Sequence, residues 1–415
     1  NDFKTLKLVC VSMVKLCFDK KDWSKLNSTL AVISKKRAQS KVAITSIVEE
    51  AMTYIKDTPT EDIKMELITT LKDVCAGKMY VEAECARLHL MLAKILENRN
   101  DIDGACAMIQ DVHVETYGTL DRKEKIEFII EQIRFNLMKK DYIRTLIHSR
   151  KMNRKILGGG DKEGEVLGEG KKSMNELKVV YYTLMVEYHI EQKNYAELAD
   201  SFIKIYETAS IKAKPNTCMI EAIKSIVLFV LLTKYDTKQQ ELLKTISKWS
   251  VFDEPFVVPN TSTSTSATTA MDTDEVPTAT EGDVEYAQNV TLLAPYLNIL
   301  KIFTTTEIIP TQFNGLELLT THCNNLMHSN STEKFIGGDA IQEKSGDFIE
   351  VLRVRVIQHN IRVIATYYTT IRMSRMCELL NLGREELEFQ LTELCTSGNI
   401  MCSVYSIIYS VVYSI

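Results

Sequence analysis

Apolar residues recur along the first half of the chain with the period of an amphipathic helix. Three segments show the spacing most clearly, with apolar residues three or four positions apart at Leu26, Leu30 and Ile33, at Ile143, Leu146 and Ile147, and at Leu198, Phe202, Ile205 and Tyr206. Such spacing places the apolar side chains on one face of each helix. The pattern predicts helices whose apolar faces are covered by neighbouring helices.

A short polar step returns roughly every 40 residues along the same half. It reads KKDW, TEDI, RNDI, KKDY, QKNY and KYDT, and its acidic or amide residues are Asp22, Asp62, Asp101, Asp141, Asn194 and Asp236. Asp and Asn are favoured at helix N-caps, where the side chain accepts a hydrogen bond from a free amide of the first turn. One interval is longer and contains GGGDKEGEVLGEGKKS, residues 158–173, which we interpret as a loop between hairpins. Six stacked hairpins predict a right-handed, TPR-like helical-repeat solenoid over residues 1–235.

The pattern changes after this solenoid. Residues 259–283 are rich in Thr and Ser and nearly free of large apolar side chains. Such a segment cannot bury enough apolar surface to offset the entropy of ordering, so we expect a disordered insert. Helical patterning returns at Val290–Phe303 and again at Phe348–Tyr368. We therefore expect residues 236–355 to form a second helical region that carries the insert.

The last part of the chain has the pattern of a winged helix, which we place at residues 356–415. Ser374 is the expected N-cap of a short helix that ends at Asn381, and Gly383 begins a second helix. In that second helix Leu387, Leu391 and Leu394 share one face, and Gly398 supplies a left-handed stop. The following MCSVYSIIYSVVYSI is apolar and has no charged residue. As an exposed sheet edge it would be prone to aggregation.

Winged helices often bind DNA, but the charge of this one argues against that function. Residues 384–398 carry Arg384 against Glu385, Glu386, Glu388 and Glu393. The whole chain has a formal net charge of -5 and a pI of about 5.9. A helix that enters the major groove meets phosphates and base edges, for which cationic and amide side chains are suited. We therefore expect no nucleic-acid partner.

The segment HNIRVIATYYTTIRMSRMCELLNL, residues 359–382, resembles the start of the winged helix in PCI domains. These domains occur in the proteasome lid, the COP9 signalosome and initiation factor 3. The segments AIKSIVLFVLLTKYDTKQQELLKTI, LNILKIFTTTEII and IYET make the chain most similar to a lid subunit of the proteasome. The resemblance implies a mainly α fold, a solenoid followed by a PCI module, and no catalytic activity. A subunit of the COP9 signalosome similar to its subunit 4, or a winged-helix nucleic-acid-binding protein, is the alternative.

The resemblance also implies partners and a location. They are the other PCI subunits of the lid, the lid deubiquitinase, the ATPase base and the core particle, in a hetero-oligomer of the cytoplasm and nucleus that serves ubiquitin-dependent protein degradation. Winged-helix domains of neighbouring subunits pair edge to edge in this family. An exposed strand edge has unpaired N–H and C=O groups that a second strand can bind. The expected interface residues are Thr370, Ile371, Met373, Asn399, Ile400, Cys402 and Val404.

Residues that suggest chemistry lack the patterns that the chemistry requires. Gly170-Lys171-Lys172-Ser173 departs from a phosphate-binding loop by an extra Lys, and no strand precedes it. His322, Cys323 and His328 match no common zinc spacing. We expect His359 to serve helix packing or capping, and the pair Tyr367-Tyr368 to lie in a core. We therefore expect no catalytic residue, cofactor or metal.

Compartment signals are few. The ten cysteines are scattered without a compact disulfide framework, which favours reduced thiols. The first residues, NDFKTLKLVC, lack an initiator Met and the layout of a signal peptide, so we expect a truncated N-terminus. No window is long and apolar enough for a membrane span, and no membrane partner is expected.

Overall fold

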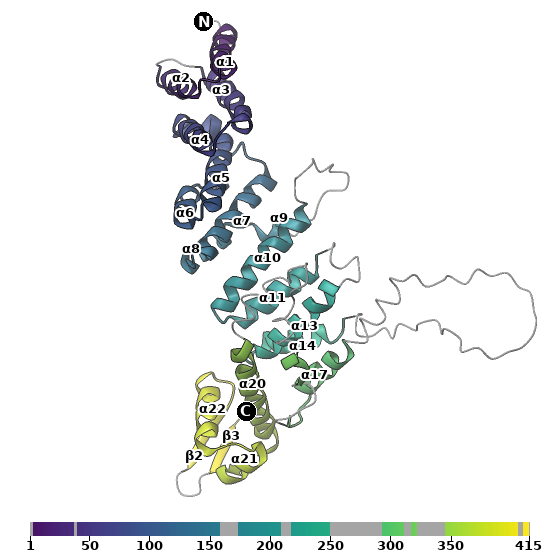
Figure 1. The fold of residues 1–415 in the computed structure, drawn as a ribbon. Helices are drawn as coiled ribbons and strands as arrows, with labels where there is room; N and C mark the ends of the chain where they lie inside the picture. Colours follow the sequence, from purple (N-terminus) through teal and green to yellow (C-terminus); the bar gives the residue numbers. More distant parts are fainter. Residues whose placement is uncertain are drawn as a thin grey trace, which may run out of the picture. The chain divides into compact units, whose positions relative to one another are not determined.

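The computed structural model describes residues 3–36, 40–157, 173–208, 217–249, 293–310, 317–321, 345–405 and 410–414. Most of these residues are helical, and the chain divides into two compact units, Asn1–Val180 and Tyr181–Ile415 (Figure 1). The first unit contains α1 (Phe3–Asp19), α2 (Trp23–Lys35), α3 (Lys41–Thr53), α4 (Glu61–Cys75), α5 (Glu82–Asn98), α6 (Ile102–Gln110), α7 (Arg122–Met138), α8 (Tyr142–Lys151) and α9 (Arg154–Leu157), with short 3-10 turns between some of them. The division falls within α10 (Met174–Glu191).

The second unit continues with α11 (Tyr195–Tyr206), α13 (Thr217–Leu232), α14 (Thr237–Ile246), α17 (Ala294–Thr304), α20 (Ser345–Tyr367), α21 (Met373–Leu380) and α22 (Arg384–Thr396). Its strands are β1 (Thr370–Arg372), β2 (Met401–Tyr405) and β3 (Ser410–Ser414). This content confirms the prediction of a helical-repeat array followed by a module that ends in a winged helix. The domain boundaries at 235 and 355 stay predictions; α20 runs continuously through position 355.

Four hairpin turns share one backbone geometry. The residue before each N-cap is left-handed, with φ of 53° at Lys21, 61° at Asn100, 62° at Lys140 and 52° at Lys193. The N-caps that follow are Asp22, Asp101, Asp141 and Asn194, and each side chain accepts from the amide three residues later. Each cap amide also donates to the carbonyl five residues earlier, as in a Schellman motif; at Asp141 this bond to the Asn136 oxygen is 2.8 Å long. The N-cap residue of each hairpin thus bonds to both helices: its amide donates to the end of the first helix, and its side chain accepts from the first turn of the second.

The other two polar steps differ. Asp236 is the N-cap of α14, but its side chain accepts from the amide of the adjacent Thr237. The prediction that Asp62 caps a helix was wrong, because Thr60 is the N-cap of α4 and accepts from the amide of Ile63. Asp62 lies in the first turn instead, where its negative charge is favoured by the helix dipole.

The apolar stripe predicted for α8 does not face the core. Ile143 is 77% exposed and Ile147 is 50% exposed, whereas Thr145, His148 and Ser149 are buried. α8 packs against α7, whose buried face includes the polar Gln132 and Asn136. Thr145 and Ser149 can be buried at this contact because their hydroxyl groups donate to the carbonyls of Asp141 and Leu146, within their own segment.

The other two predicted stripes are buried. Leu26, Leu30 and Ile33 of α2 join a cluster that includes residues of α1, α3, α4 and α5. In Figure 1 the helices of the first unit follow one another as stacked pairs, and α5 packs on both α4 and α6. Because each helix is covered by its neighbours in the sequence, the core of this unit is a continuous line of contacts.

α13 is the central helix of the second unit. Its residues from Met219 to Leu232 are buried with few exceptions, and it packs against α11, α14, α17 and α20. The ring of Phe229 stacks on Phe202 of α11 with centroids 5.5 Å apart and meets Phe348 of α20 edge to face at 5.6 Å. A helix that is apolar on all sides must be enclosed, which explains its place among four others.

The winged helix consists of α21, α22 and a three-stranded antiparallel sheet (Figure 1). The sheet order is β1-β3-β2, so the last described strand lies in the middle. Ile371 of β1 pairs with Val411, and Ser403 of β2 pairs with Val412. The apolar C-terminal run therefore contributes a paired inner strand rather than only an exposed edge, because β1 binds its other side.

Several predicted features of the helix pair are confirmed. Asn381 is left-handed at the C-cap of α21, Gly383 is the N-cap of α22, and Gly398 has φ of 73°. The N-cap predicted at Ser374 was wrong. α21 begins at Met373 because β1 leads directly into it, and Arg372 holds the N-cap position.

Other expectations lie outside the described residues. They concern the insert at 259–283, nearly all of the glycine-rich loop at 158–173, and His322, Cys323 and His328. Within the described ranges no three His, Cys, Asp or Glu side chains come together as metal ligands. Nor does any described helix combine the length and hydropathy of a membrane span.

Candidate protein-interaction site

The long helix α20 holds an irregular segment, residues 305–310, against its side. The Asn360 side chain makes two hydrogen bonds with the backbone of Ile309: its Oδ1 accepts from the amide at 2.8 Å, and its Nδ2 donates to the carbonyl at 2.7 Å. The adjacent residue, His359, adds a contact to the same segment: its Nε2 lies 3.2 Å from the carbonyl oxygen of Glu307. Both side chains are buried. These bonds satisfy backbone groups of a segment that has no regular structure.

His359 has the packing role that its position suggested. Its ring lies 5.6 Å from that of Phe303, and burial lowers its pKa to about 4. A neutral imidazole is therefore the stable form in this core. Tyr367 and Tyr368, by contrast, are not core residues: they are 68% and 41% exposed. α20 ends there, and the Tyr367 hydroxyl donates to the carbonyl of Thr306 instead of being buried.

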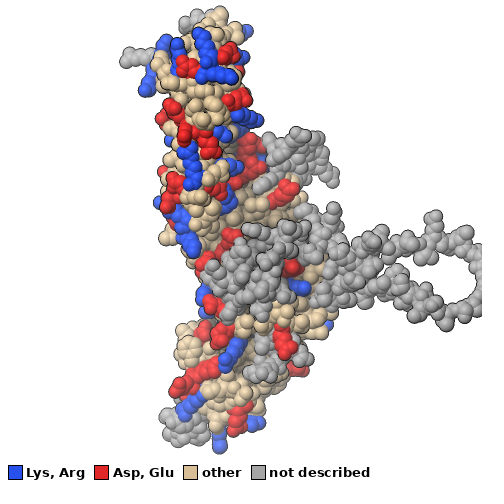
Figure 2. Space-filling model, in the orientation of Figure 1, with Lys and Arg blue, Asp and Glu red and all other residues tan. Residues whose placement is uncertain are grey.

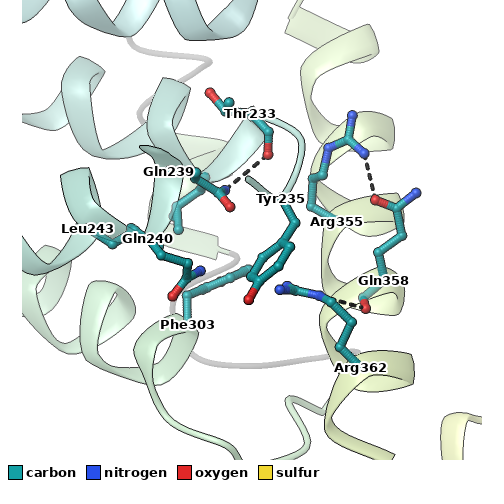
Figure 3. Close-up of a pocket in the computed structure, with 10 residues that line it drawn as sticks. Thr233, Tyr235, Gln239, Gln240, Leu243, Phe303, Arg355, Gln358 and Arg362 are labelled. Carbon is teal, nitrogen blue, oxygen red and sulfur yellow. Dashed lines mark hydrogen bonds between the residues drawn. The ribbon is translucent and has the colours of Figure 1, made fainter. Parts of the chain in front are cut away.

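A polar cluster joins α20 to the helices on either side of it (Figure 3). The Arg355 Nε donates to the carbonyl of Leu232 at the end of α13 at 3.0 Å, and Arg355 Nη1 donates to Gln358 Oε1 at 2.6 Å. Gln358 Nε2 in turn donates to Gln390 Oε1 at 3.0 Å and to Glu393 of α22 at 3.1 Å. This chain of bonds links α13, α20 and α22.

A second arginine completes the cluster. The Arg362 guanidinium carbon lies 3.3 Å from the centre of the Tyr235 ring, and Figure 3 shows the side chain pointing toward that ring. Burial lowers the pKa of Arg362 to about 10, and the cation–π contact partly replaces the lost hydration. The cavity between these side chains measures about 10 Å³. That volume is enough for about one water molecule, and the hydrogen bonds of the cluster join α13, α20 and α22.

The core of the winged helix is built by the predicted leucines. Leu387, Leu391 and Leu394 of α22 are buried with Met373 and Met376 in one apolar cluster. The cluster also contains Ile357, Ile361 and Ile364 of α20, so α20 forms part of the winged-helix core. The orientation of the sheet is therefore tied to α20.

The acidic residues of α22 are largely used within the chain. Glu386 lies 3.6 Å from Arg353 of α20, and Glu393 lies 3.6 Å from Lys234. Glu388 pairs with Arg384 on the same helix at 2.8 Å. α22 thus turns part of its negative charge toward α20, which explains why the position that carries cations in a DNA-binding protein is acidic here.

The outer strands β1 and β2 contain or adjoin the predicted interface residues. Thr370 and Ile371 lie in β1, Cys402 and Val404 lie in β2, and Asn399 and Ile400 precede β2. Within the described residues each of these strands pairs on one side, with β3, and the other side carries no strand. The side chains of Ile371, Met373 and Ile400 are buried inside the domain. A partner at these positions would therefore meet backbone groups rather than those three side chains.

Sequence reasoning predicted a packing role for His359 but missed the roles of Gln358, which bonds to α22, and of Asn360, which bonds to Ile309. Gln358, His359 and Asn360 are consecutive buried polar residues in a helix that is otherwise apolar on its inner side. Consecutive side chains point in different directions around a helix. The run of three polar residues could have indicated three separate polar contacts. It could not have indicated their partners, which lie in distant parts of the chain.

Comparisons with known proteins agree with this architecture. The family described as PSMD12/CSN4, N-terminal, matches residues 1–214, and the PCI domain family matches residues 319–407. The 26S proteasome non-ATPase regulatory subunit 12 homolog A of Arabidopsis thaliana is 34% identical over 403 residues, which cover 94% of this chain and 80% of that protein.

Two further relatives are more distant in sequence. The 26S proteasome non-ATPase regulatory subunit 12 of Dictyostelium discoideum is 29% identical over 97% of this chain and 76% of its own length. The 26S proteasome regulatory subunit RPN5 of Saccharomyces cerevisiae is 27% identical over 97% of this chain and 77% of its own length. Because one family matches residues 1–214, the PCI domain family matches residues 319–407 and the relatives align across both, the chain belongs to the family of 26S proteasome non-ATPase regulatory subunit 12.

Proposed function

We propose that this chain is a non-catalytic scaffold subunit of the 26S proteasome regulatory particle, and that it assembles with other PCI subunits in the lid. The observation that carries the proposal is the alignment to proteasome regulatory subunits over 94% to 97% of the chain. The described fold offers long helical surfaces and a sheet with open sides, both of which suit protein partners.

Assembly through the winged helix would use β-strand addition. A strand of a neighbouring subunit would extend the β1-β3-β2 sheet at β2 or at β1 through main-chain hydrogen bonds. β2 is the better candidate because it has five residues, against three in β1. Met401, the first residue of β2, is 66% exposed and supplies apolar contact beside the edge.

The same proposal covers the wider complex. The lid deubiquitinase, the ATPase base and the core particle are the expected further partners, and the cytoplasm and nucleus are the expected locations. A COP9 signalosome scaffold is the second candidate, because the family that matches residues 1–214 includes CSN4 in its description. The relatives reported above all carry proteasome names, which favours the first candidate.

Affinity purification of the tagged full chain followed by mass spectrometry tests the assignment. Recovery of lid subunits supports the first candidate, and recovery of signalosome subunits supports the second. A wild-type chain recovered alone as a monomer contradicts both.

The strand-edge interface has its own test. Met401→Pro removes a backbone donor from β2 and should reduce recovery of PCI partners by about tenfold or more. Phe389→Ala is the matched control, since Phe389 is 66% exposed on α22 and lies outside the sheet. Circular dichroism should show both variants folded. Equal recovery with Met401→Pro and wild type, or a larger loss with Phe389→Ala, would show that the edge is not the interface.

A further inference from the structure

The exposed face of α8 carries apolar side chains where a solvent-facing helix normally carries polar ones. Ile143 and Ile147 are four residues apart, so they lie on the same side of the helix, and they are 77% and 50% exposed. The opposite face buries Thr145, His148 and Ser149. Thr145 and Ser149 satisfy their hydroxyl groups within the helix, by donating to the carbonyls of Asp141 and Leu146. The usual amphipathic arrangement is thus reversed in α8.

Cationic side chains border this pair on both sides. Helical geometry places Arg150 on one side of Ile143 and Ile147, and Lys151 and Arg144 on the other. The segment 139–155 contains seven Lys or Arg residues and one Asp, a net charge of +6 in a chain of net charge -5. Figure 2 shows blue side chains at the place that α8 occupies in Figure 1.

Part of this charge is held by the chain itself. Lys139 pairs with Asp103 at 2.7 Å, Lys151 with Glu115 at 3.1 Å, and Arg144 with Asp141 at 3.5 Å. Arg150 is exposed at the end of the helix beside the isoleucines. After these pairs are counted, Arg150 supplies the positive charge beside the isoleucines, at one border of the apolar pair.

We propose that this α8 face binds an acidic amphipathic helix of a neighbouring protein subunit. Two isoleucines one turn apart fit the apolar stripe of such a helix, and Arg150 fits a carboxylate at the border of the stripe. Nucleic acid fits this face less well, because phosphates bind cationic and polar side chains and the centre of the face is occupied by two exposed isoleucines. A membrane surface fits less well too, because interfacial binding relies on a larger apolar face with Trp, Phe or Leu.

This inference rests on the proposed scaffold function, because it gives the helical repeats a partner of defined chemistry. The two can fail separately. Variants of α8 should leave the winged-helix sheet intact and keep assembly through β2, whereas Met401→Pro should lose that assembly and keep the α8 face.

A pair of synthetic peptides tests the proposed chemistry with the full chain. Both are amphipathic helices with the same leucine stripe, flanked by Glu in one peptide and by Lys in its twin. By fluorescence anisotropy, the wild-type chain should bind the Glu peptide about tenfold more tightly than the Lys peptide. Ile143→Asp and Arg150→Glu should each remove most of this preference.

Two control variants separate the α8 face from exposed positions elsewhere. Val32→Asp changes a side chain that is 57% exposed on α2, and Arg122→Glu reverses an exposed charge at the start of α7. Both should bind the Glu peptide like the wild type. Equal binding of the two peptides, no binding of either, or equal losses in the controls would overturn the proposal. So would Ile143-dependent binding to duplex DNA or to vesicles of phosphatidylserine that exceeds binding to the Glu peptide.

The assembled complex supplies the second test. A photocrosslinking residue at position 147 should join the chain to a peptide of another subunit in which Asp or Glu flanks an apolar helical stripe. A crosslink to a second copy of this chain, to a basic peptide, or to no protein would also overturn the proposal.

Discussion

Asn360 offers a direct test of how the second unit is held together. Its side chain is 3% exposed and makes two hydrogen bonds, both with the backbone of Ile309, which is 1% exposed. Asn360→Ala removes both bonds at once. It leaves the amide and carbonyl of Ile309 buried and without the partner that they have in the native chain.

The expected loss follows from these two bonds. A typical neutral hydrogen bond contributes about 1 kcal/mol to stability, and a buried backbone group left without a partner costs about 1 to 3 kcal/mol. These contributions overlap, since the cost of an orphaned group already contains the lost bond. We therefore expect Asn360→Ala to reduce the free energy of unfolding of the second unit by about 2 to 4 kcal/mol.

Hydrogen exchange measured by mass spectrometry on the full chain isolates this effect from the first unit. Peptides that cover residues 305–310 should lose protection in Asn360→Ala, whereas peptides from α5 and α6 should not change. Thr392→Ala is the matched control, because its exposed hydroxyl bonds only within α22, and its effect should stay within about 0.5 kcal/mol. Unchanged protection at 305–310 in Asn360→Ala would refute the reasoning.

Three further predictions concern the hairpins. Asp101→Ala removes the N-cap bond to the amide of Gly104 and should destabilise the first unit by about 1 kcal/mol in urea unfolding; an unchanged midpoint would contradict this. Lys140→Gly relieves a left-handed residue with φ of 62° and should raise stability by up to about 1 kcal/mol, whereas Lys139→Gly, at a right-handed position, should lower it. Burial lowers the pKa of His148 to about 4 from an ordinary 6.5. The unfolded chain therefore takes up this proton first, so stability is full above pH 6.5 and falls between pH 6.5 and 4. His148→Gln should make the unfolding free energy of the first unit less dependent on pH in that window, and an identical pH profile would count against the assignment.

The sequence by itself determined the repeats and the winged helix, because both depend on neighbours along the chain. A cap such as Asp101 and a stop such as Gly398 act within one or two turns of their own position, so their patterns can be read locally. The stripe of Leu387, Leu391 and Leu394 is likewise a property of one helix. The acidic residues of 384–398 are also a local feature, and they predicted that the winged helix does not bind DNA.

Only the tertiary structure decided which faces are covered. The stripe of α8 has the spacing of a buried face, yet Thr145, His148 and Ser149 are buried instead, and Ile143 and Ile147 remain exposed. The order of the sheet was also beyond local pattern, since β3 inserts between β1 and β2 although it comes last in the sequence. Asn360 finds its partner 51 residues away. Period and spacing say which side chains share a face, but the choice of neighbour depends on contacts between distant segments, and these contacts leave no local pattern in the sequence.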